Sequence, residues 1–140
     1  MNKTVYPLAR TTLSDDGKFA GPVAFSNGVK VSGGDLLFIS GQLAFDGNME
    51  LTGKGDMGAQ TRQVLNNIAK VLDQAGGTFQ DIVRVTVYVK DISRFREIHD
   101  ARLEFFDAEH LPASTMVEIS EFVHDDALIE IDAIAVIAGS

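Results

Sequence analysis

The chain has 140 residues, and its 20 acidic and 12 basic side chains give a formal net charge of −8 at pH 7. Broad binding to nucleic acid needs Lys and Arg to neutralise phosphates, so this charge argues against a nucleic-acid partner. Cysteine is absent, which excludes disulfides and thiolate chemistry. No stretch approaches the roughly 18 consecutive apolar residues of a membrane span, and the first seven residues lack the apolar core of a signal peptide. We therefore expect one cytoplasmic domain over residues 1–140, without a membrane partner.

The first strands are predicted after residues 1–20, which show no sustained hydrophobic period. A short apolar run ends at Val31, and a second run begins at Leu36. The residues between them, Ser32-Gly33-Gly34-Asp35, are typical of a turn, so the pattern predicts a β-hairpin. The segment Ser40-Gly41-Gln42 follows the second of these strands.

Two helices and a strand are predicted in the middle of the chain. The first helix spans residues 58–75, because its apolar residues recur at helical spacing. These residues are Val64, Leu65, Ile68, Val71, Leu72 and Ala75. The second helix spans residues 92–109, with Asp91 as its N-cap and Pro112 preventing its continuation. Between them, residues 82–89 alternate as a strand. Its valines form one face, and the other face holds Ile82, Arg84, Thr86 and Tyr88.

The last thirty residues predict two strands, residues 114–119 and 127–137, joined by a polar loop. One face of the final strand is entirely apolar, and the other seats Glu130 and Asp132 among aliphatic neighbours. Two helices can cover only one face of a sheet of this size, so we expect the mixed face to meet water or another chain. The mixed faces hold Arg84, Tyr88, Met116, Glu118, Glu130 and Asp132. Because Tyr, Met and Arg are enriched at interfaces, we expect a homo-oligomer built through this face.

Glu130 is the most informative residue of the chain. A charged carboxylate is costly to bury without a partner, so the pKa of Glu130 is expected to rise. Such a group can serve as a general acid or base near neutral pH. The alternative is an exposed or interface carboxylate that is paired with Lys or Arg. The alternation of residues in the strand leaves both interpretations open.

Other motifs point to ordinary structure. His99 and His110 lie eleven residues apart on one predicted helix, about 16 Å along its axis at 1.5 Å per residue, so they cannot bind one metal ion. His124 stands in a polar loop without zinc-site spacing, and we expect no metal site. Ser40, Ser114 and Thr115 are nucleophile candidates by position only. Hydroxyls that bond to the backbone at strand ends are the simpler interpretation.

Six blocks of the sequence, in order, resemble the Rid family. This is the reactive intermediate deaminase family, also called YjgF/YER057c/UK114 or endoribonuclease L-PSP. The blocks are Phe25-Ser26-Asn27-Gly28-Val29-Lys30-Val31, Leu36-Leu37-Phe38-Ile39-Ser40-Gly41-Gln42, Gln60-Thr61-Arg62-Gln63-Val64-Leu65-Asn66-Asn67-Ile68, Val85-Thr86-Val87-Tyr88-Val89-Lys90-Asp91, Pro112-Ala113-Ser114-Thr115-Met116-Val117-Glu118 and Ile129-Glu130-Ile131-Asp132-Ala133-Ile134-Ala135. The resemblance covers nearly the whole chain from about residue 20.

The resemblance implies a chorismate-mutase-like α+β fold, in which a mixed β-sheet carries two helices on one face. It also implies a homotrimer whose sheets form a central barrel, with three clefts between the subunits. Characterised members hydrolyse reactive enamines and imines to a carbonyl compound and ammonia. They need no cofactor, so we expect none here, and we expect a small-molecule substrate.

The resemblance also assigns candidate site residues. Glu130 would hold or activate water as the catalytic acid or base, and Ser40 and Gly41 would line the substrate pocket. Phe25 stands where the family usually has Tyr, so a hydroxyl group that orients the substrate or water is missing. Met116 stands where many members have Cys or Thr.

Ser114 is the departure from the family pattern with the largest expected effect on substrate binding. The family pattern is Pro-Ala-Arg-Ser/Thr, and its Arg binds the substrate carboxylate, whereas this chain reads Pro-Ala-Ser-Thr. Loss of a charge-assisted contact weakens binding by roughly 10- to 150-fold, unless Arg84, Arg10 or His124 replaces it.

Three functions therefore remain open. The first is a deaminase with a non-standard substrate, which could resemble the aminomuconate deaminases. The second is a non-catalytic small-molecule-binding or chaperone-like trimer. The third is a ribonuclease, which the acidic charge disfavours.

Overall fold

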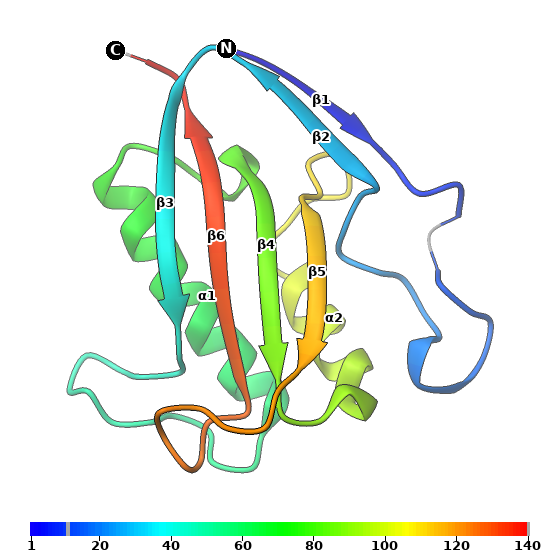
Figure 1. The fold of residues 1–140 in the computed structure, drawn as a ribbon, viewed down its shortest axis with the longest axis vertical. Coiled ribbons are helices and arrows are strands. Elements are labelled where there is room, and N and C mark those ends of the chain that lie inside the picture. The colour runs from blue at the N-terminus through cyan, green and yellow to red at the C-terminus, as the bar shows by residue number, and fades with distance from the viewer. Residues whose placement is uncertain (11, 140) are drawn as a thin grey trace.

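The computed structural model describes residues 1–10 and 12–139 as a mixed sheet with two helices. The four-stranded sheet has the order β3-β6-β4-β5. Its strands are β3 (Asp35–Gln42), β6 (Ile129–Ile137), β4 (Ile82–Val89) and β5 (Ala113–Glu118). β3 and β4 pair with β6 in antiparallel fashion, and β5 runs parallel to β4. A separate antiparallel pair is formed by β1 (Asn2–Tyr6) and β2 (Gly28–Ser32), beside the β5 edge in Figure 1. The predicted α+β class is confirmed.

Helices α1 (Met57–Gln74) and α2 (Phe95–Leu103) both lie on one face of the sheet (Figure 1). The apolar core lies between them and the inward strand residues. Its fully buried members include Val64, Leu65, Ile68, Leu72, Ile98, Val85, Val87, Val89, Ile129, Ile131 and Ala135. The side chain of Asp56 accepts a hydrogen bond from the amide of Ala59 and caps α1. At the other end, the amide of Gly77 donates to the carbonyl of Leu72. Three short 3-10 turns complete the fold: η1 (Gly17–Phe19), η2 (Phe79–Asp81) and η3 (Ile92–Arg94).

The predicted hairpin around Gly33 and Gly34 is wrong. A turn does form there, and both glycines have positive φ, 74° and 83°. However, β2 pairs with β1, a strand that the sequence pattern did not predict, and β3 pairs with β6. A Cβ on Gly34 would lie 2.7 Å from the Cγ1 of Val136, so the turn is packed against the end of β6. The turn therefore directs β3 to the edge of the large sheet, and Figure 1 shows β2 and β3 diverging from it.

Two side chains of β5 point to the opposite face from the predicted one. Met116 lies beside Val87, and Glu118 beside Val89, in the parallel β4–β5 ladder. Directly paired residues share a face, so both side chains lie on the helix side. Glu118 accepts a hydrogen bond there from the amide of Ile92.

The sequence pattern also missed an irregularity in β4 and the end of the second helix. Ile82 is fully buried, because the pairing with β6 shifts between Ile82 and Arg84. α2 ends at Leu103, well before the predicted end at residue 109. Within the described residues, no helix is both long and apolar enough to cross a membrane.

Truncation of a core residue tests this packing. Ile68 is fully buried beneath the sheet, so Ile68→Ala should lower the free energy of unfolding by about 2–5 kcal/mol. The control Val123→Ala alters a side chain that is 92% exposed, and its effect should stay within about 0.5 kcal/mol. Urea unfolding measures the free energy of unfolding of both variants. The protein concentration must be the same for each, because association between chains changes the apparent stability. Equal losses in the two variants would contradict the assigned core.

Candidate functional site

The six candidate residues fall into two groups in the folded chain. Phe25, Ser114 and Met116 line one cavity on the helix side of β5. Ser40, Gly41 and Glu130 lie at the other edge of the sheet, where β3 meets β6. We call the first the α2 cavity and the second the β3–β6 group.

The α2 cavity has a volume of about 220 Å³ and mostly aromatic and aliphatic walls. Its lining residues are Leu13, Phe19, Phe25, Ile92, Phe95, His99, Arg102, Ser114 and Met116. The ring of Phe95 contacts that of Phe19 edge to face, with the centroids 5.1 Å apart. It lies 4.0 Å from the ring of His99, and Phe25 lies 5.9 Å from the same ring. A small apolar pocket with few polar groups is the usual form of a ligand site.

His99 is a neutral side chain in this cavity. Its Nδ1 accepts a hydrogen bond of 2.9 Å from the amide of Ala24, so the ring proton belongs on Nε2. Burial, followed by the charges of Arg102 and Arg96, lowers the pKa of His99 to about 2. The imidazole therefore offers a hydrogen-bond donor without a positive charge.

Arg102 is the cation of the cavity, and it is 1% exposed. Its Nη2 donates a hydrogen bond of 2.9 Å to the carbonyl of Ala24. Its Nε and Nη1 have no hydrogen-bond partner among the described residues. Burial lowers the pKa of Arg102 to about 10, so the guanidinium stays charged at neutral pH.

Glu130 belongs to the outer face of the sheet, opposite Tyr88 of β4. The β3–β6 register shifts between Ile39 and Gln42, and this irregularity brings Gly41 against the Glu130 carboxyl. A Cβ on Gly41 would lie 2.8 Å from the Cδ of Glu130, so only glycine leaves room for this carboxyl position. Burial, and then the neighbouring Asp132, raise the pKa of Glu130. No ion pair within the described chain involves Glu130.

The two groups do not meet within one chain. β4 lies between β6 and β5, so the strands that carry Glu130 and Ser114 are two strand spacings apart, about 10 Å. Ser114 is paired with the inward Val85, whereas Glu130 is paired with the outward Tyr88. Their side chains therefore project to opposite faces of the sheet.

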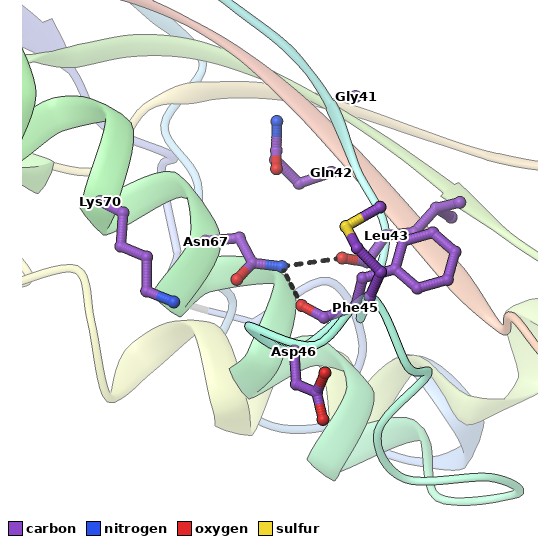
Figure 2. Close-up of a pocket in the computed structure, with 8 residues that line it drawn as sticks. Gly41, Gln42, Leu43, Phe45, Asp46, Asn67 and Lys70 are labelled. Atoms are coloured by element: carbon purple, nitrogen blue, oxygen red, sulfur yellow. Dashed lines mark hydrogen bonds between the residues drawn. The ribbon is translucent and has the colours of Figure 1, made fainter.

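Gly41 also borders a hollow of about 310 Å³ beneath the loop that follows β3. Figure 2 shows Asn67 of α1 reaching this loop, where its Nδ2 donates to the carbonyls of Leu43 and Phe45 at 3.0 and 2.9 Å. The carboxylate of Asp46 accepts hydrogen bonds from two amides of the same loop. These polar groups hold the loop, and Asp46 and Asn67 also line the hollow, together with Lys70.

The three expected replacements for the family Arg lie outside the α2 cavity. Arg84 donates to the hydroxyl of Thr115 on the outer face. Arg10 donates to backbone carbonyls of its own loop. The Nδ1 of His124 accepts a hydrogen bond from the amide of Asp126. No group of three metal-ligating side chains occurs in the part of the chain that the structure describes.

Arg102 was missed by the sequence analysis. It lies four residues after Ile98 and three before Phe105, so it occupies a position of the apolar stripe of the predicted helix. A charged residue at such a position is the signal that could have identified it, because Arg is almost never fully buried unless it is paired.

Comparisons with known proteins agree with this fold. The model of the Endoribonuclease L-PSP family matches residues 18–137. A RutC family protein of Pyrococcus horikoshii is 43% identical over 105 residues, covering 75% of this chain and 82% of that protein. The crystal structure of the Rid family protein YyfB from Yersinia pestis has a TM-score of 0.80 at 31% identity, covering 98% of this chain and all of that one. RidA from an Antarctic Psychrobacter has a TM-score of 0.67 at 32% identity, covering 91% and 99%. The chain therefore belongs to the Rid family, also called YjgF/YER057c/UK114 or endoribonuclease L-PSP.

Proposed function

We propose that this protein hydrolyses a reactive imine or enamine to a carbonyl compound and ammonia, with Glu130 as the acid and base. One observation carries the proposal. Glu130 is a carboxyl of raised pKa that forms no ion pair among the described residues and rests against a glycine that leaves room for it. A carboxyl group can accept a proton and return it within one reaction, and a raised pKa favours its protonated form. We also propose that residues 1–140 form a single functional domain.

We further propose that the active unit is a homotrimer with the site between neighbouring copies. Leu36 and Phe38 project from the outer face of β3 and are 65% and 69% exposed. Large apolar side chains gathered on one face are typical of a surface that another chain covers. The opposite orientations of Ser114 and Glu130 support the same arrangement, because a second copy is needed to bring a Glu130 to the α2 cavity.

The proposed reaction proceeds by proton transfers through Glu130 and needs no cofactor. An enamine first takes a proton from solvent at its β-carbon and releases an N–H proton to solvent, which gives the imine. The Glu130 carboxylate then takes a proton from water as the water oxygen bonds to the imine carbon, and the C=N electron pair moves to nitrogen. Protonated Glu130 returns the proton to that nitrogen. When the carbinolamine collapses, Glu130 takes the hydroxyl proton and passes it to the leaving ammonia, so the carboxylate is regenerated.

A second candidate function is non-catalytic binding of a small molecule. It is favoured by Phe25, which brings no hydroxyl group to the α2 cavity, and by Ser114, which brings no charge. Ammonia release separates the two candidates, because a binding protein would retain a ligand without turnover.

Glu130→Gln should reduce ammonia release from a panel of imines and enamines by about 10²- to 10⁴-fold, because the amide cannot exchange the proton. Asp132→Asn is the matched control on the same strand face. It should retain activity, with the pH profile moved to lower pH, because Asp132 contributes to the raised pKa of Glu130. Unchanged turnover by Glu130→Gln on every substrate that the parent hydrolyses would refute the assigned role.

The same substitution tests the pKa of Glu130 through stability. A raised pKa in the folded chain means that folding favours the protonated carboxyl. The protonated carboxyl therefore adds to the free energy of unfolding. This gain is fully present below the ordinary carboxyl pKa of 4.5, and it is lost as the pH rises through the pKa of Glu130 in the folded chain. Glu130→Gln should therefore have a higher melting temperature than the parent at pH 7, and the difference should vanish below pH 4.5. A variant that is less stable than the parent at pH 7 would contradict this.

Phe38→Lys should convert the trimer to a monomer, because it places a charge in the proposed contact between copies. Sedimentation equilibrium should give three times the chain mass of 15.1 kDa for the parent and one chain mass for the variant. Val123→Lys, at a loop residue that is 92% exposed, should leave the trimer intact. A parent that sediments as a monomer at micromolar concentration would exclude the shared site.

A further inference from the structure

We propose that Arg102 is the carboxylate-binding residue of the α2 cavity, and that the ligand is a small organic acid with an apolar body. The cation would then come from helix α2, and not from the β5 position where the family has Arg and this chain has Ser114. This inference rests on the proposed function for the reaction, but the binding site can be tested without it.

The first argument is the unsatisfied state of Arg102. The side chain is fully buried, yet its Nε and Nη1 donate to nothing in the described chain. No Asp or Glu of the described residues forms an ion pair with it. Leaving a buried charge without a partner destabilises a fold. A residue kept at such a cost is expected to meet its partner from outside the chain, and a guanidinium is suited to a carboxylate.

The second argument is the composition of the cavity. The rings of Phe19, Phe25 and Phe95 supply apolar walls, and Ser114 and neutral His99 supply the other polar groups. The cavity therefore combines one positive charge with an apolar lining. A volume of about 220 Å³ is below the roughly 300–1,000 Å³ typical of drug-sized ligands, so an acid of a few carbons fits better than a nucleotide.

The third argument is the local charge. Among the described residues that line the cavity, Arg102 is the one that carries a charge at neutral pH. Nearby Arg96 forms an ion pair with Asp100 and hydrogen-bonds to the carbonyl of Ala20. A lone cation attracts an anion and disfavours a cationic ligand.

Butanoate and butanamide form a matched pair of probes, because they have nearly the same shape and differ in charge. Calorimetric titration of the purified protein at low salt should show that it binds butanoate more tightly than butanamide. Arg102→Met should weaken butanoate binding by about 10- to 150-fold and change butanamide binding little. Arg62→Met is the control, because Arg62 forms an exposed ion pair with Glu104 away from the cavity.

Melting temperatures distinguish a binding residue from a structural one. In the ligand-free protein Arg102→Met should melt at the same temperature as the parent or higher, because an unpartnered buried charge is removed. Butanoate should raise the melting temperature of the parent and not that of the variant. A variant that melts lower, together with unchanged preference for the acid, would show that Arg102 only holds Ala24 in place.

A rescue variant keeps the test decisive if Arg102→Met folds poorly. Arg102→Met with Ser114→Arg returns a cation to the cavity from β5 and should restore the preference for butanoate. Equal binding of acid and amide by the parent would overturn the proposal without any variant. The experiments can refute the two proposals separately. If Arg102→Met loses acid binding but the parent releases no ammonia from any substrate, the anion site stands and the proposed reaction is refuted. If turnover depends on Glu130 but not on Arg102, the proposed reaction stands and the role of Arg102 is refuted.

Discussion

Side chains of a β-strand alternate between two faces, and in this protein the two faces of the large sheet have different surroundings. Helices α1 and α2 cover one face, and no helix of the described residues lies on the other. The position of a residue in its strand therefore decides its environment. Ser114 shares a face with Val85 and meets α2, whereas Glu130 shares a face with Tyr88 and points away. A shift of one residue in either strand would exchange these environments, so the division of the candidate residues follows from strand register.

Elements with a strong period could be predicted from the sequence. α1 begins and ends within one residue of the prediction, because its apolar stripe is long and its ends carry a cap and glycines. The two faces of β6 were predicted because its apolar and polar residues alternate clearly along the strand. The hairpin prediction failed because local pattern identifies a turn but does not choose the partners of its strands. Those partners are β1 and β6, and β6 lies about a hundred residues away.

Part of the candidate site was named from the sequence, but its arrangement was not. The family resemblance named Phe25, Ser114 and Met116, and the structure gathers these three in one cavity. The sequence could not place Met116, because the face it occupies depends on the parallel register with β4. It also could not show that Arg102 is buried, since that depends on the segment around Ala24, which accepts its hydrogen bond from a distant part of the chain.

The protonation states in the α2 cavity have a consequence for how the protein works in a changing environment. His99 has a pKa of about 2 and Arg102 one of about 10, so neither changes its charge between mildly acidic and mildly alkaline conditions. The pocket keeps a constant single positive charge over that whole interval. A change in acidity over that interval would therefore leave unaltered the charge that these two side chains present to a ligand.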